Sequence, residues 1–161
     1  MTSIRRKLED GAGILCKVFL PIKQEYYFGS GKSDAICTLS STDLLELMIS
    51  TSSLMEKVLI VGRLLSENRG IDAIVNRVMN YPELRRIIVC GKEVKGHRAG
   101  QALIALARNG IDSNGRIIGA SGPNPVIMQS QMNVEIFRHQ VQIIDLIGNV
   151  DIAEISRILV A

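Results

Sequence analysis

The chain has 161 residues, a length typical of one compact domain, and 47% of them are hydrophobic, which excludes a disordered or low-complexity protein. Its formal net charge is +3, and the basic residues are spread along the chain apart from a short run at positions 5–7. With aromatic residues at only 4%, this distribution argues against a nucleic-acid groove, which needs concentrated positive charge and rings for base stacking.

Short runs of β-branched residues alternate with helical patterns, which predicts a mostly parallel sheet covered by helices. The runs predict strands at Ile14–Phe19, Ala35–Leu39, Val58–Val61, Ile87–Cys90, Arg116–Ile118 and Val141–Leu146. Apolar residues at helical spacing predict helices over Thr42–Ser50, Ile71–Asn80, His97–Asn109, Asn133–Gln140 and Asp151–Val160. Thr42 and Asp151 are the predicted N-caps, and Gly110 is the predicted glycine at a helix end. We therefore expect a single doubly wound, Rossmann-like α/β domain over residues 1–161, in which Pro21–Ser33 forms a hairpin or an irregular excursion.

Neither the cysteines nor the apolar segments indicate a secreted or membrane protein. Cys16, Cys37 and Cys90 make an odd count and lie in apolar stretches, which is typical of reduced core thiols in a cytosolic protein. The longest apolar runs are far shorter than the roughly 20 residues that a membrane helix needs, and no signal peptide is recognisable. We expect a soluble, cytoplasmic protein with no membrane span in this chain.

Three loops rich in glycine and polar residues follow predicted strands, over residues 62–70, 91–97 and 119–125. Right-handed crossovers bring the carboxyl ends of parallel strands to one edge of the sheet, where open α/β sheets bind their ligands. Glycines directly after strands allow a ligand to approach the backbone closely. Three such loops predict a broad, flat binding surface rather than a single phosphate cradle.

His97 is the sharpest candidate for chemistry, because it is expected at the N-terminus of its helix. The helix dipole disfavours the imidazolium form there, and the neutral imidazole is the form that binds metals. Glu93, four residues earlier, could accept a hydrogen bond from the ring and orient it. The alternative is a histidine that only caps or packs at a helix start. For His139, beside Arg138 on a charged helix face, we expect a solvated surface residue.

Other common sites do not fit the sequence. Structural zinc needs paired Cys or His ligands, and no such spacing occurs. The run Gly31-Lys32-Ser33 lacks a glycine at the P-loop spacing, and none of the three loops carries a dinucleotide-binding fingerprint. A Cys90–His97 nucleophile pair is conceivable, but Cys90 ends a strand that we expect to be buried. A histidine that binds the metal of a preassembled macrocycle needs none of these patterns, because the ring supplies the other ligands.

The segment around His97 reads Cys-Gly-Lys-Glu-Val-Lys-Gly-His-Arg-Ala-Gly-Gln over residues 90–101. Other motifs are spread over the rest of the chain: Ser66-Glu67-Asn68, Gly70-Ile71, Asn109–Asp112, Gly115–Ala120, Pro125, Phe137, Gln140-Val141 and Ile144–Gly148. Together they resemble the corrinoid-binding A subunit of tetrahydromethanopterin S-methyltransferase, whose central histidine motif is similar to residues 90–101. The resemblance covers residues 58–161 and, more weakly, Ala35–Leu39.

The resemblance implies that the chain holds cobalamin or a related cobamide, with His97 as the lower axial ligand of the cobalt. In the family, the reduced cobalt takes a methyl group from methyl-tetrahydromethanopterin and passes it to the thiolate of coenzyme M, a step of methanogenesis. The chain would thus be a methyl carrier that is active only with partner subunits of a methyltransferase. The family's C-terminal hydrophobic helix, which ties it to membrane subunits that move sodium, does not occur in the sequence up to Ala161.

The resemblance also extends the set of expected cofactor contacts beyond His97. Glycines would let the macrocycle approach, and polar residues could meet its amide fringe or nucleotide tail, although loop turns and helix caps use the same residue types. The expected contacts are Gly62, Ser66, Glu67, Asn68, Gly91, Glu93, Gly96, Gly100, Gly119, Ser121, Asn124 and Pro125. The alternatives to a methyl carrier are a non-catalytic protein that stores, senses or delivers corrinoid, and a fold that serves only protein–protein contacts.

Overall fold

The computed structural model describes residues 26–159, so the predicted strand Ile14–Phe19 and Cys16 lie outside the described residues. The described part contains a five-stranded sheet with the strand order β1-β3-β2-β4-β5. Its strands are β1 (Tyr26–Phe28), β2 (Asp34–Cys37), β3 (Ile60–Gly62), β4 (Arg86–Gly91) and β5 (Gln142–Ile147). The helices are α2 (Thr42–Ser50), α3 (Ser52–Met55), α4 (Arg69–Asn80), α5 (Ala99–Asn109), α6 (Gln131–Gln140) and α7 (Ile152–Ile158).

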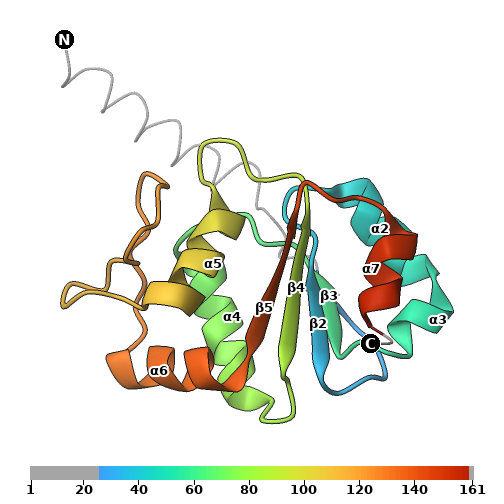
Figure 1. Ribbon diagram of the computed structural model, residues 1–161, viewed down its shortest axis with the longest axis horizontal. Helices are drawn as coiled ribbons and strands as arrows, with labels where there is room; N and C mark the ends of the chain where they lie inside the picture. The colour runs from blue at the N-terminus through green and yellow to red at the C-terminus, as the bar shows by residue number, and fades with distance from the viewer. Residues whose placement is uncertain (1–25, 160–161) are drawn as a thin grey trace, which may run out of the picture.

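Strands β3, β2, β4 and β5 are parallel, and the edge strand β1 runs antiparallel to β3. Ile36 of β2 pairs with Val61 of β3 on one side and with Ile88 of β4 on the other. The chain passes from β2 to β3 and then crosses back over β2 to reach β4, so the direction of winding reverses beside β2. The predicted doubly wound, Rossmann-like α/β fold is therefore confirmed (Figure 1).

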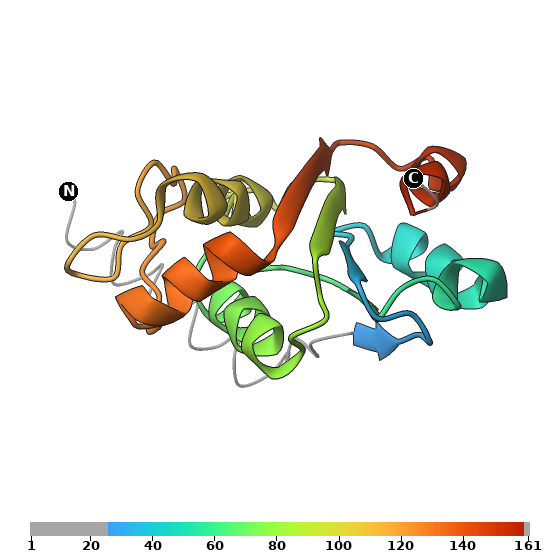
Figure 2. The same cartoon turned by 60° about the horizontal axis from the view of Figure 1, so that its bottom comes forward.

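Both faces of the sheet are covered, which explains why its central strands read as continuous hydrophobic runs. In β4, Ile87 and Val89 join the apolar core that α4, α5 and α6 complete. Their neighbours Ile88 and Cys90 join a second core on the opposite face, which α2, α3 and α7 complete. Figures 1 and 2 show these two groups of helices on either side of the sheet.

Most predicted elements are confirmed, with their ends displaced by two residues or fewer. The confirmed strands are Ala35–Leu39, Val58–Val61, Ile87–Cys90 and Val141–Leu146, which correspond to β2 to β5. The confirmed helices are Thr42–Ser50, Ile71–Asn80, His97–Asn109, Asn133–Gln140 and Asp151–Val160, the last within its described part. Asp151 caps α7, accepting hydrogen bonds from the backbone of Ala153 and Glu154, and Gly110 follows α5 with a φ of 74°.

Two predictions are wrong. The segment Arg116–Ile118 forms only isolated bridges and no strand of the sheet. The chain turns on both sides of it, at Gly115 and Gly119, whose φ angles are 76° and 83°. The N-cap position of α2 belongs to Ser41, and Thr42 is the first helical residue. The Ser41 hydroxyl does not cap the helix, since it accepts a hydrogen bond from the backbone of Lys92.

Two short elements were not predicted. Helix α3 spans a single turn, and β1 lies in the described part of the segment Pro21–Ser33. All three residues of β1 are exposed, so no alternation of buried and exposed positions marks the strand in the sequence. Within residues 26–159, no helix is long and apolar enough to span a membrane.

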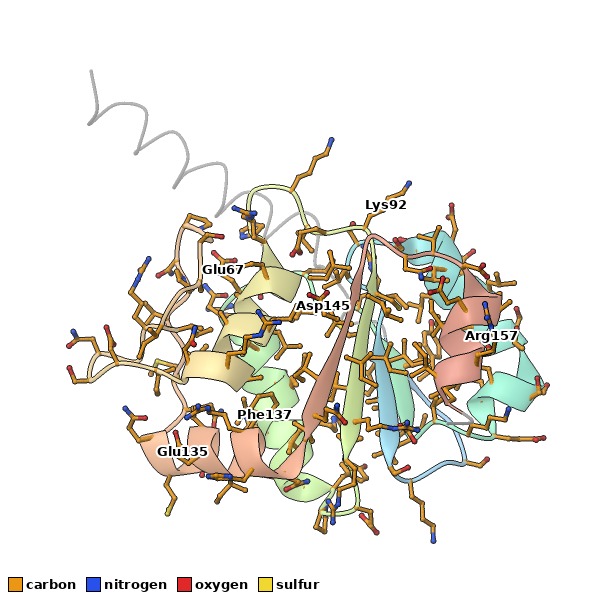
Figure 3. The ribbon with its side chains drawn as sticks, viewed as in Figure 1. Glu67, Lys92, Glu135, Phe137, Asp145 and Arg157 are labelled. Atoms are coloured by element: carbon orange, nitrogen blue, oxygen red, sulfur yellow. The ribbon has the colours of Figure 1, made fainter. Side chains whose placement is uncertain are left out.

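Phe137 on α6 provides a test of the core beneath α4, α5 and α6, in which it is fully buried (Figure 3). Phe137→Ala should leave a cavity and lower the free energy of unfolding by about 3–5 kcal/mol. The neighbouring Ile136 is 44% exposed, so Ile136→Ala should change that free energy by less than about 1 kcal/mol. Chemical unfolding followed by circular dichroism measures both variants, and equal losses would contradict this packing.

Burial raises the pKa of the Cys37 and Cys90 thiols from 9.0 to about 12. Because the thiolate is the reactive form, neither should react with Ellman's reagent near neutral pH in the folded chain, whereas both should react after unfolding. A Cys16→Ser background limits the signal to these two thiols. The pKa values of both thiols are higher in the folded chain than in the unfolded chain. The free energy of unfolding should therefore fall as the pH rises from 9 towards 12. Rapid labelling of the folded chain would contradict this.

Candidate functional site

The loops that follow β3 and β4 meet at the carboxyl edge of the sheet, as their sequence predicts. The first loop carries Glu67 just before α4, and the second carries His97 just before α5. Figure 3 shows Glu67 beside the first turn of α5 and Lys92 at the end of β4. The two loops come from strands that flank β2, so they meet where the direction of winding reverses, the usual ligand position in such sheets.

A hydrogen bond joins the two loops, with His97 Nδ1 at 2.8 Å from Glu67 Oε2. The Glu67 side chain is 1% exposed, whereas the His97 side chain is 54% exposed. A buried carboxylate is costly unless its oxygens are hydrogen-bonded. Glu67 meets this requirement, because its Oε1 accepts a hydrogen bond from the backbone nitrogen of Asn124 at 3.0 Å. Both oxygens of the buried carboxylate are thus engaged.

This arrangement decides which ring nitrogen of His97 is available. A carboxylate oxygen only accepts hydrogen bonds, so Nδ1 carries the hydrogen and, in the neutral ring, Nε2 keeps a lone pair. Among the described residues, no hydrogen bond engages Nε2. A histidine held through Nδ1 by a carboxylate is a common arrangement for metal ligands, because it fixes the ring and raises the basicity of Nε2.

His97 lies in the loop before α5 and not in the helix itself. Helix α5 begins at Ala99, because Arg98 has a left-handed backbone with φ 51° and ψ 46°. Gly96 is also left-handed, with φ 82°, so the chain turns sharply on both sides of His97. An added Cβ at Gly96 would meet no atom within 4 Å, which leaves open space beside the histidine.

The prediction that Glu93 orients the His97 ring is wrong. The Glu93 carboxylate accepts hydrogen bonds from the backbone nitrogens of Val94, Gly100 and Gln101, at 2.8, 3.0 and 2.8 Å. These groups include amides at the start of α5 that have no partner within the helix. Glu93 therefore caps α5, and Glu67, thirty residues before His97, is the acid that holds the ring.

The third predicted loop, 119–125, reaches the same site although no strand of the sheet precedes it. Its Gly122 lies so close to the histidine loop that an added Cβ would stand 2.4 Å from the His97 carbonyl oxygen and 3.0 Å from Glu67 Cγ. Only glycine permits this approach. The side chain of Asn68 also donates a hydrogen bond to the Asn124 carbonyl at 3.4 Å. All three loops predicted from the sequence thus converge around Glu67.

Several of the other candidate residues make contacts within the protein. Gly91 and Gly100 are buried: an added Cβ would stand 2.4 Å from the Thr38 carbonyl and 2.9 Å from the Leu39 side chain, respectively. The carbonyl of Gly62 accepts a hydrogen bond from Thr38. The absence of side chains at Gly91 and Gly100 therefore serves the packing of the chain on itself.

The polar candidates support the loops and the helix starts. The hydroxyl of Ser66 accepts from the backbone of Gly70, and the side chain of Asn68 accepts from Arg69, so both bind the first turn of α4. In the third loop, the carbonyl of Gly119 and the hydroxyl of Ser121 bind the side chain of Gln101. Pro125 is buried, and its carbonyl accepts from Ile117.

Three contributions to the site were not predicted, those of Gly122, Asn124 N and Gln101. Gly122 was one of two glycines in the third predicted loop, with nothing to mark it as the one that lies against His97. Asn124 contributes its backbone nitrogen, which its residue type does not reveal, and Gln101 was only one letter of the histidine motif. His139, by contrast, is 85% exposed, which confirms its prediction as a solvated residue. Within residues 26–159, no group of three or more His, Cys, Asp or Glu side chains lies close enough to hold a metal ion.

The loop that bears His97 is cationic on its exposed side. Lys92, Lys95 and Arg98 are exposed, and none forms an ion pair with an acid among the described residues. Glu93 is the only acid in this loop, and its oxygens are turned to the backbone of α5. Within residues 26–159, the site therefore combines an exposed imidazole nitrogen with basic side chains that form no ion pair.

Comparison with known proteins shows which family this chain is similar to. The family model for the A subunit of tetrahydromethanopterin S-methyltransferase matches residues 17–160. The second A subunit of this enzyme from Methanothermobacter thermautotrophicus is 46% identical over 90 residues, which are 55% of this chain and 49% of the relative. The A subunit of the same enzyme from Methanocaldococcus jannaschii is 37% identical over 139 residues, 84% of this chain and 56% of the relative.

The chain spans about half the length of these two relatives. The match to the family model nevertheless covers nearly all of the chain, including the three loops around Glu67. It confirms the resemblance inferred from the motif around His97. The chain belongs to the family formed by the A subunits of tetrahydromethanopterin S-methyltransferase.

Proposed function

We propose that this chain carries a corrinoid, cobalamin or a related cobamide, and that His97 binds the cobalt through Nε2. The observation that carries the proposal is the hydrogen bond from His97 Nδ1 to the buried Glu67 carboxylate. It leaves the lone pair of Nε2 on an exposed ring whose orientation is fixed. This is the state that a metal-binding histidine requires.

The donor set of the site fits a metal that brings most of its own ligands. A corrin would supply most of the ligands of its cobalt, so the protein would need to add only one donor, and the exposed imidazole of His97 would meet that need. A corrinoid supplies the capacity to accept and release a methyl group at cobalt. The tasks left to the chain are to hold the ring through His97, to fix the imidazole through Glu67 and to leave space for the macrocycle around Gly96.

The surroundings of His97 suit the periphery of a cobamide. Lys92, Lys95 and Arg98 offer positive charge for the phosphate of its nucleotide tail. The exposed loop residues Ser121 and Asn124 offer polar groups for its amide fringe.

The family supports a role in methyl transfer. The two relatives described above are named as A subunits of tetrahydromethanopterin S-methyltransferase. We therefore propose that the chain is the methyl-carrying subunit of a methyltransferase of the methyl-tetrahydropterin-to-thiol type, and that it works with partner subunits that bind donor and acceptor. A carrier of this kind splits one difficult transfer into two simpler displacements.

The test is a titration of the purified chain with cobalamin in the dark, followed by visible spectra, with other cobamides as further ligands. The native chain should bind and shift the spectrum, and His97→Ala should abolish the shift. Glu67→Gln removes an acceptor and should weaken binding about 10-fold to 100-fold. His139→Ala is the matched control, because His139 is the second histidine and is 85% exposed, and it should bind like the native chain.

Circular dichroism of each variant establishes that the fold is intact, so that a lost spectral shift reports the site itself. Unchanged spectra of the native chain with every cobamide would refute the corrinoid proposal. Binding that survives in His97→Ala with an unaltered spectral shift would refute His97 as the ligand while leaving corrinoid binding in place.

A further inference from the structure

Hydrogen bonds of the Gln101 carboxamide attach the loop 119–125 to helix α5. Gln101 Nε2 donates a hydrogen bond to the Gly119 carbonyl at 2.9 Å. Its Oε1 accepts two, from the backbone nitrogen and the hydroxyl of Ser121, both at 3.0 Å. The carboxamide thus donates to one residue of the loop and accepts from another. A shorter or apolar side chain cannot make both kinds of hydrogen bond.

The same loop supplies the second hydrogen bond of the buried Glu67 carboxylate. Asn124 N donates to Oε1, while His97 Nδ1 binds Oε2. Between Ser121 and Asn124, the backbone of Gly122 lies against the His97 carbonyl and the Glu67 side chain. A displacement of the loop would therefore remove a donor from Glu67 and alter the packing on which its orientation depends.

Gln101 is also bound to the histidine loop from the other side. Its backbone nitrogen donates to Glu93 Oε2 at 2.8 Å, and Glu93 belongs to the loop that carries His97. The contacts form a closed circuit that runs from His97 to Glu67, to the loop 119–125, to Gln101 and back through Glu93. Gln101 is the member of this circuit that joins the two loops without touching the histidine.

We infer that Gln101 is a positioning residue that keeps the imidazole of His97 in the Nδ1–H tautomer. It does so by holding the loop 119–125 in place, which keeps the Glu67 carboxylate aligned with Nδ1. Without Gln101, the aligned acceptor is lost and the ring populates the Nε2–H tautomer, which a free histidine favours in water. The consequence for cobalt binding rests on the proposed function, because a protonated Nε2 has no lone pair for a metal. The tautomer itself can be measured without any cofactor.

The experiment is nitrogen-15 NMR of the imidazole rings in the cofactor-free chain, at a pH where histidine is ordinarily neutral. His97→Ala assigns the His97 signals, and His139 serves as an exposed internal reference. In the native chain, His97 should show a protonated Nδ1 and an unprotonated Nε2. In Gln101→Met, which keeps side-chain length but makes no hydrogen bond, the two ring nitrogens should move towards the values of a tautomer mixture.

Two further variants separate positioning from simple stabilisation. Gln101→Glu keeps an acceptor for Ser121 but loses the donor to Gly119, so it should give an intermediate tautomer population. Gln140→Met is the matched control, since the Gln140 carboxamide donates to the carbonyls of Val78, Tyr81 and Leu84, far from the loop. Gln140→Met should lower the stability of the chain and leave the His97 tautomer unchanged. If a general loss of stability were enough to change the tautomer, this variant would change it too.

An Nδ1–H tautomer that persists unchanged in both Gln101 variants would overturn the inference. A shift of the tautomer in the control Gln140→Met, equal to that in Gln101→Met, would overturn it as well. Cobalamin affinity is the second readout and should fall about tenfold in Gln101→Met. A tautomer shift in a chain whose native form binds no cobamide would uphold the role of Gln101 and refute only the proposed function.

Discussion

The hydrogen bond between His97 Nδ1 and Glu67 Oε2 is the interaction on which the site depends, because it joins an exposed ring to a buried carboxylate. The buried acid cannot go without donors, so the chain supplies one from His97 and one from the backbone of Asn124. The same bond fixes the ring and determines which nitrogen keeps its lone pair. The position and the chemistry of the histidine therefore have a single cause.

The fold explains how this bond forms between residues so far apart in sequence. Strands β3 and β4 flank β2, and the chain crosses over β2 between them, so the loops after both strands emerge at the same edge. Left-handed residues on each side of His97 turn the second loop, and the Glu93 cap fixes the start of α5 behind it. The loop 119–125 then closes over Glu67. Each element in this arrangement has a sequence reason: a hydrophobic strand, a capping acid or a glycine at a close approach.

Sequence reasoning predicted the architecture and singled out His97 as a candidate residue, but it did not predict the contacts between the residues of the site. Buried strands such as β4 are recognisable as continuous apolar runs. His97 was recognised because it lies in a glycine-rich loop after one of these strands. Its partner was misassigned because Glu93 is four residues away and a helix was expected to begin at His97, whereas the left-handed Arg98 delays α5 to Ala99. Glu67 was named as a cofactor contact, yet its bond to His97 depends on tertiary packing. A backbone donor such as Asn124 N cannot be predicted from residue type, because every residue except proline carries the same N–H group.

The most direct test of cobalt ligation by His97 is the electron paramagnetic resonance spectrum of the chain loaded with cob(II)alamin, prepared with and without nitrogen-15 histidine. The unpaired electron of this form couples to the nitrogen bound to the cobalt, so isotope labelling shows whether that nitrogen belongs to a histidine. If His97 is the ligand, the triplet splitting from ordinary nitrogen becomes a doublet when histidine is labelled. A triplet that labelling leaves unchanged, or a spectrum without nitrogen splitting, would contradict the claim that His97 holds the cobalt.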